Sequence, residues 1–141
     1  MLSRIVYSSQ VAPEFSASDL EPLLARARQR NTDSDISGAL IFVDGVFLQI
    51  LEGEHDAVAA LMEKIARDPR HTDVTVFHES EIGERAFQSW RMACLTPDAE
   101  KVLAWAGLEG SVPFDELLAD VRKNPQMLPR IVVSIVETLA A

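Results

Sequence analysis

The stretch Val46–Gly53 sets the strongest limit on how this chain can fold. It reads Val-Phe-Leu-Gln-Ile-Leu-Glu-Gly and follows the dipeptide Asp44-Gly45. Asp-Gly favours a tight hairpin turn, so the stretch predicts a strand that pairs with the apolar residues 40–43. Alternate residues of a strand point to opposite faces, and both faces of this one are mostly apolar. The sequence therefore predicts a central hairpin that is covered on both sides.

Gln49 is the polar exception in this strand. It shares a face with Phe47 and Leu51. A buried amide offers two donors and an acceptor, and leaving one of them unmet costs roughly 1–3 kcal/mol. The partner is either a backbone or hydroxyl group, which is the commoner case for a lone buried Gln, or a ligand on that face. The strand pattern alone leaves both alternatives open.

The rest of the first 95 residues alternates between strand and helix patterns. Tyr7 falls on the inward face of the first strand. The order strand, helix, strand, strand, helix, strand, strand predicts an α+β ferredoxin-like sandwich, β-α-β-β-α-β plus an extra strand, with both helices on one sheet face. The expected segments are strand 2–8, a helix from Ser16 or Ser18 to about Arg30-Asn31, strand 36–43, the strand described above, a helix from about 54 to Asp68-Pro69, and strands 74–82 and 91–95.

From Pro97 onwards the pattern becomes helical. We expect short helices over about 98–106, 113–123 and 129–139, although Ile131–Val136 also suits a strand. Such a C-terminal helical cap would bury the sheet face that the two crossover helices leave open. The predicted organisation is a domain over residues 1–95 followed by a cap over 96–141.

Charge and cysteine content restrict the kind of partner. The formal net charge is −9, from 13 basic and 22 acidic residues, with no basic cluster, which disfavours nucleic-acid binding. The single cysteine, Cys94, cannot form an intramolecular disulfide, and we found neither a membrane-length apolar run nor a signal peptide. The three histidines, His55, His71 and His78, lack metal-ligand spacing. We expect a cytoplasmic protein without a metal site, bound to neither nucleic acid nor membrane.

Three further features are weak when each is taken alone. Asp68-Pro69-Arg70-His71 suits a solvated helix end, the commoner case, although Arg70 and His71 could also hold a phosphate. Trp90 and Met92 at strand spacing are typical of a core, and Asn31 after a helix is typical of a C-cap.

Taken together and in order, these residues resemble one family, the BLUF domains, which are sensors of blue light using FAD. The resemblance covers about residues 1–95, in family order and spacing. The matching segments are 4–9 (Arg-Ile-Val-Tyr-Ser-Ser), Asn31 with 36–40 (Ile-Ser-Gly-Ala-Leu), 45–53, Ile65 with 68–71, 85–87 (Arg-Ala-Phe) and 90–92 (Trp-Arg-Met).

The resemblance implies that FAD is held non-covalently between the two helices, with FMN or riboflavin also accepted. Tyr7 is then similar to the family's light-dependent electron donor, Gln49 to its hydrogen-bond switch, and Trp90 and Met92 to the mobile pair of the last strand. The residues that the resemblance implies as flavin contacts are Tyr7, Ser9, Arg30, Asn31, Phe47, Gln49, Lys64, Ile65, Asp68, Arg70, His71 and Met92.

The implied function is a blue-light photoreceptor that turns over no substrate. A phenol can give an electron and its proton to an excited flavin, and rotation or tautomerisation of the Gln49 amide can then change its hydrogen bonds. Because about 45 residues after the domain are too few for a cyclase or phosphodiesterase, we expect output through a homo-oligomer or a separate protein partner.

Two other functions suit the same fold. One is a light-independent, flavin-dependent redox enzyme, in which Arg70 and His71 would bind phosphate and Tyr7 would orient a substrate. The other is a ligand-binding regulatory module without flavin.

Overall fold

The structure is a computed structural model of the chain. It describes residues 1–11, 15, 17–43, 45–69, 71–87 and 91–95, together with residues 123, 131 and 134. Arg70, Trp90 and almost all of the expected cap lie outside the described residues, so the predictions made for them stay predictions.

Five strands form one sheet in the order β4-β1-β3-β2-β5. β1 is antiparallel to both β3 and β4, β2 is antiparallel to β3, and β5 is parallel to β2 at the edge. The elements are β1 (Leu2–Val11), the short 3-10 helix η1 (Ala17–Asp19), α1 (Leu20–Asp33), β2 (Ser37–Val43), β3 (Val46–Glu54), α2 (His55–Arg67), β4 (His71–Glu81) and β5 (Ala93–Leu95).

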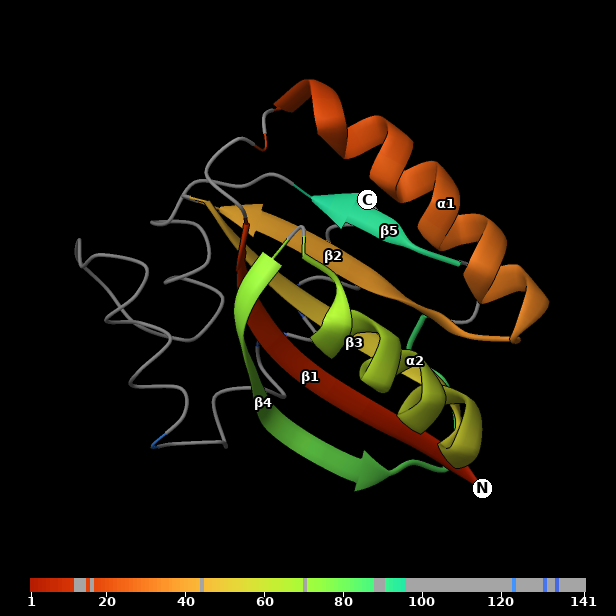
Figure 1. Ribbon diagram of the computed structural model, residues 1–141. Coiled ribbons are helices and arrows are strands. Elements are labelled where there is room, and N and C mark those ends of the chain that lie inside the picture. Colours follow the sequence, from red (N-terminus) through yellow and green to blue (C-terminus); the bar gives the residue numbers. More distant parts are fainter. Residues whose placement is uncertain are drawn as a thin grey trace.

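This topology follows from the two crossovers. α1 connects β1 to β2 and α2 connects β3 to β4, and each of these strand pairs has one antiparallel strand between its members. Figure 1 shows both helices on the same face of the sheet. The predicted ferredoxin-like arrangement with an extra strand, β5, is therefore confirmed for the described part of the chain.

The core between sheet and helices is built as the alternation of β3 predicts. Phe47 and Leu51 belong to it, whereas Leu48 and Ile50 point to the other face. That second face is also buried: Leu48 and Ile50 are each 1% exposed. The helical contribution to the core comes from residues at helical spacing: Leu24, Ala27, Val58, Leu61 and Ile65.

Several element boundaries differ from the predictions. β1 continues to Val11 and does not end near 8. α1 continues to Asp33, so Asn31 lies in its last turn and is not the C-cap; Ser34 takes that position. β4 begins at His71 and not near 74, because its first residue pairs with Val11 of β1. β5 starts at Ala93 and not at 91. Apolar periodicity does not indicate the polar ends of α1 and β4, because hydrogen bonding alone extends these two elements there.

The hairpin of β2 and β3 depends on glycine at position 38. A Cβ at Gly38 would lie 2.0 Å from the backbone oxygen of Ile50, whereas a Cβ at Gly83 would meet nothing within 4 Å. We expect Gly38→Ala to lower the free energy of unfolding by about 1–3 kcal/mol, because the strands must move apart. Gly83→Ala is the matched control, and urea denaturation measures both variants. Equal stability of the two would contradict this account of Gly38.

Candidate functional site

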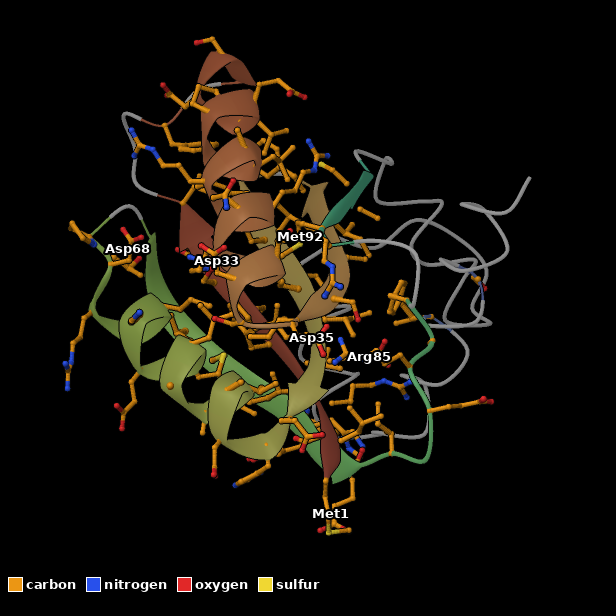
Figure 2. All side chains as sticks on the ribbon, turned by 90° about the vertical axis from the view of Figure 1, so that its right-hand side faces the viewer. Met1, Asp33, Asp35, Asp68, Arg85 and Met92 are labelled. Carbon is orange, nitrogen blue, oxygen red and sulfur yellow. The ribbon has the colours of Figure 1, made fainter. Side chains whose placement is uncertain are left out.

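A cavity opens between α1, α2 and the sheet. Its empty space is about 540 Å³, including the open mouth. Asp68 near the end of α2 and Met92 near β5 approach it from different sides (Figure 2). The residues that line it are Tyr7, Leu23, Arg26, Ala27, Arg30, Leu40, Phe47, Gln49, Ile65, Asp68 and Met92.

Three neighbouring strands supply the floor of this cavity. Tyr7 of β1 lies opposite Gln49 of β3, and Gln49 lies opposite Leu40 of β2. Tyr7 is 1% exposed and Gln49 7%. Because directly opposite residues on one sheet face are close neighbours, the register alone brings the phenol and the amide together.

The Gln49 amide has one strong and one weak partner. The Tyr7 hydroxyl donates a hydrogen bond to Gln49 Oε1. Gln49 Nε2 lies 3.5 Å from the sulfur of Met92, which is a weak acceptor. The acceptor end of the amide is thus satisfied within the protein, while the donor end keeps capacity for a stronger acceptor in the cavity.

Burial disfavours ionisation of the Tyr7 phenol. Burial is the largest influence and raises its pKa well above the ordinary value, the nearby Arg30 charge lowers it, and Asp68 raises it. The anion is disfavoured because a charge loses more hydration free energy than a neutral phenol does on burial. Tyr7 therefore holds its proton in the hydrogen bond to Gln49.

Asn31 carries an unmet polar atom. It is fully buried, and its Nδ2 donates a 2.6 Å hydrogen bond to the Arg91 carbonyl. Its Oδ1 is buried and has no hydrogen-bond partner among the described residues. Buried polar atoms are rarely left unpaired. Asn31 is not itself among the residues that line the cavity.

The structure brings seven of the predicted contact residues together in the lining of the cavity. Lys64 is exposed on α2 and does not line the cavity, and Ser9 is buried on β1, where it pairs with Phe47. His71 is described only as the first residue of β4. The predicted residues that do line the cavity are Tyr7, Arg30, Phe47, Gln49, Ile65, Asp68 and Met92.

Four cavity residues were not predicted: Leu23, Arg26, Ala27 and Leu40. The signal for the three on α1 was present, because residues 23, 26, 27 and 30 lie at helical spacing on one face. Leu23 and Ala27 are apolar at helical spacing, which is typical of a core, and Arg26 is charged, so the pattern alone does not indicate a shared binding surface.

Two general findings hold for the described part of the chain. None of its helices is long and apolar enough to cross a membrane. It contains no group of three or more His, Cys, Asp or Glu residues that could hold a metal ion.

Comparison with known proteins identifies the family. The family described as "BLUF: Sensors of blue-light using FAD" matches residues 2–93. The chain belongs to the BLUF family. As a member, it is a blue-light sensor that uses FAD.

Relatives and solved structures agree with this membership. The photoactivated adenylate cyclase subunit beta of Euglena gracilis is 37% identical over 136 residues, which cover 96% of this chain and 15% of the relative. The photo-activated state of BlsA is 28% identical with a TM-score of 0.79, covering 96% of this chain and 95% of BlsA. The dark state of BlrB, a BLUF protein, has the same fold, with 23% identity, a TM-score of 0.77, and coverage of 97% and 96%. A light-independent redox enzyme finds no support among these proteins.

The buried phenol gives a pH prediction. The chain contains one tyrosine, so the ¹³Cζ NMR signal of labelled tyrosine reports Tyr7 alone. In the folded protein this signal should show no ionisation near pH 10, the ordinary midpoint, because burial raises the pKa of Tyr7. The unfolded chain in urea should ionise near that pH.

The same shift links Tyr7 to stability. Its contribution is fully present below about pH 10 and is lost as the pH rises from there toward the folded-state pKa, because only the unfolded chain then releases the proton readily. A folded-state midpoint equal to that in urea would contradict the assignment of Tyr7 as a buried, neutral phenol.

Proposed function

We propose that Tyr7 and Gln49 are the photoactive pair of this sensor and that the FAD ring lies in the cavity above them. The observation that carries the proposal is the hydrogen bond from the Tyr7 hydroxyl to Gln49 Oε1 on the cavity floor. Two features support a flavin at this site: the cavity lies between the two helices and the sheet, and Gln49 Nε2 has donor capacity left for a ligand.

Four other cavity residues would contact the cofactor. Phe47 and Ile65 supply apolar walls for a flat ring. Arg30 and Asp68 offer a donor and an acceptor for its polar substituents. We keep Lys64, Arg70, His71, Asn31 and Ser9 as predicted contacts of the same cofactor, and FMN or riboflavin as accepted substitutes, since the recognised ring edge is shared.

Tyr7 supplies the electron. When bound and excited by blue light, the flavin provides an oxidising power strong enough to take an electron from a phenol. Tyr7 gives up that electron, and its hydroxyl proton leaves along the hydrogen bond toward Gln49. Both return to Tyr7 afterwards, so the cycle consumes no reductant and leaves no product.

The Gln49 amide retains the change that light produces, in the form of altered hydrogen bonds. While the phenol has lost its proton, the hydrogen bond that fixes the amide is changed, and the contact with the Met92 sulfur is weak enough to be given up at little cost. The amide can then rotate or tautomerise, which exchanges its donor and acceptor ends. Either change leaves a different hydrogen-bond donor facing the cofactor until the amide relaxes.

We propose further that residues 1–95 are the sensor and residues 96–141 a helical cap that carries the output. The burial of Leu48 and Ile50, on the sheet face away from α1 and α2, supports a cover on that face. Output then passes by contact with a second copy or a separate protein, in the cytoplasm, and not through catalysis by this chain. Trp90 and Met92 would move with the last strand.

An absorption spectrum of the purified protein tests the proposed function. In the dark it should be that of an oxidised flavin, under blue light it should move slightly to the red without bleaching, and it should recover in darkness. Free FAD under the same illumination is the control. Bleaching, or a spectrum that does not respond, would contradict the proposed photocycle.

Two substitutions test the roles of the pair. Tyr7→Phe removes the hydroxyl that donates to Gln49, and Gln49→Leu removes the amide at similar volume. Each variant should retain flavin, because cavity shape is kept, yet lose the stable red shift entirely. Arg67→Gln, an exposed change on α2, should behave as the wild type. A normal shift in Tyr7→Phe would remove Tyr7 from its proposed role.

A further inference from the structure

One carboxylate, that of Asp35, bridges two arginines from the segment between β4 and β5. Arg91 Nη1 donates to Asp35 Oδ1 at 2.9 Å, and Arg85 Nη2 lies 3.3 Å from Asp35 Oδ2 and 2.7 Å from its backbone oxygen. Figure 2 shows the Asp35 and Arg85 side chains pointing toward one another. Asp35 thus connects both ends of the stretch 85–91 to a single residue of the turn between α1 and β2.

Backbone hydrogen bonds fix this turn to α1. The Asp35 amide donates to Thr32 O at 3.3 Å, and the Ile36 amide donates to Asn31 O at 2.8 Å. Asp35 adopts a φ of +53°, a left-handed conformation that Asp tolerates better than most residues. The hydrogen bond from Arg91, and next the charge of Arg85, hold the pKa of the Asp35 carboxyl below its usual value. The bridging carboxylate is therefore both fixed in place and ionised at neutral pH.

Arg91 is held at its side chain and at its backbone. Its Nη1 also donates to the Ile36 carbonyl at 3.2 Å, while its own carbonyl accepts the 2.6 Å hydrogen bond from Asn31 Nδ2. The next carbonyl, that of Met92, accepts from Arg28 Nε at 3.1 Å. These hydrogen bonds hold the backbone from which the Met92 side chain extends.

Met92 touches Gln49 at the end of this series of contacts. Its sulfur lies 3.5 Å from Gln49 Nε2, and the side chain is 2% exposed. In a close-packed interior an amide can reorient only if the neighbouring side chain gives way. How firmly Met92 is held should therefore influence how fast the amide changes its orientation.

Building on the proposed function, we propose that Asp35 is a positioning residue of the photocycle, which keeps Met92 against Gln49 by holding Arg91. Asp35 contacts neither the cavity nor Gln49. Its side chain is 74% exposed, and exposed ion pairs contribute little to stability. Loss of its charge should thus change the rate of dark recovery while leaving the fold and the flavin affinity nearly unchanged.

The matched pair of variants is Asp35→Asn and Asp33→Asn in the full chain loaded with FAD. Asn tolerates the left-handed conformation of position 35 but lacks the charge that holds two guanidiniums. Asp33 is exposed, lies two residues earlier, and accepts a 3.2 Å hydrogen bond from Gln29. After a blue pulse, Asp35→Asn should recover in darkness roughly three- to tenfold faster than the wild type, and Asp33→Asn within about twofold.

A double variant separates this route from a general loosening of the protein. If Asp35 acts through Arg91, then Arg91→Gln should also accelerate recovery, and Asp35→Asn with Arg91→Gln should be no faster than the faster single variant. The dark spectrum, the size of the red shift and the thermal unfolding midpoint are measured alongside. We expect these three to match the wild type in Asp35→Asn.

The outcomes distinguish this inference from the proposed function. A wild type without a reversible red shift overturns the proposed function and this inference with it. If the wild type cycles, recovery in Asp35→Asn equal to that in Asp33→Asn overturns the inference alone. Additive acceleration in the double variant also overturns it, because the two residues would then act independently.

Discussion

The buried carboxylate of Glu52 is the interaction on which the described fold most depends. Its side chain has no solvent exposure and accepts hydrogen bonds from Arg4 Nε and Nη2 at 2.9 and 2.7 Å and from the amides of Ala86 and Phe87 at 3.1 and 2.8 Å. A buried charge is tolerated only when it is paired and fully hydrogen-bonded. Glu52 meets that condition by joining β1, β3 and the segment after β4, so these three parts hold a common position.

This arrangement places a structural group and the proposed photoactive amide on the same strand. Gln49 faces the cavity and Glu52 faces the opposite side of β3, three residues later. Arg85 strengthens the attachment, because it donates to the Glu52 carbonyl at 3.2 Å and to Ser37 Oγ at 3.0 Å. Residues 85–87 are therefore fixed to the strand that carries Gln49. A site whose supporting residues are themselves hydrogen-bonded can convert a small change at one amide into a defined displacement.

The sequence was sufficient for the parts that depend on local pattern. The Asp-Gly turn predicted the hairpin, and alternation placed Tyr7 and Gln49 inward, where strand register makes them neighbours. It was insufficient where polar groups act over long separations. Asn31 reads as a C-cap because the last turn of α1 is polar, and the partners of Glu52 lie 34 to 48 residues away in sequence. Such contacts follow from the completed topology and have no periodicity that a local window could detect.

The burial of Tyr7 bears both on the stability of the fold and on the proposed photocycle. Burial removes water from the Tyr7 phenol and raises its pKa, so the phenol stays protonated even at a pH where an exposed tyrosine ionises. A neutral phenol in a hydrogen bond to an amide has a proton to release only when an electron leaves with it, because a bare proton loss would leave an unsolvated anion. In the proposed photocycle, the same desolvation that raises its pKa would couple the loss of the electron and of the proton at Tyr7. Light would then disturb the hydrogen bond of Gln49, whereas ionisation of Tyr7 in the dark would not.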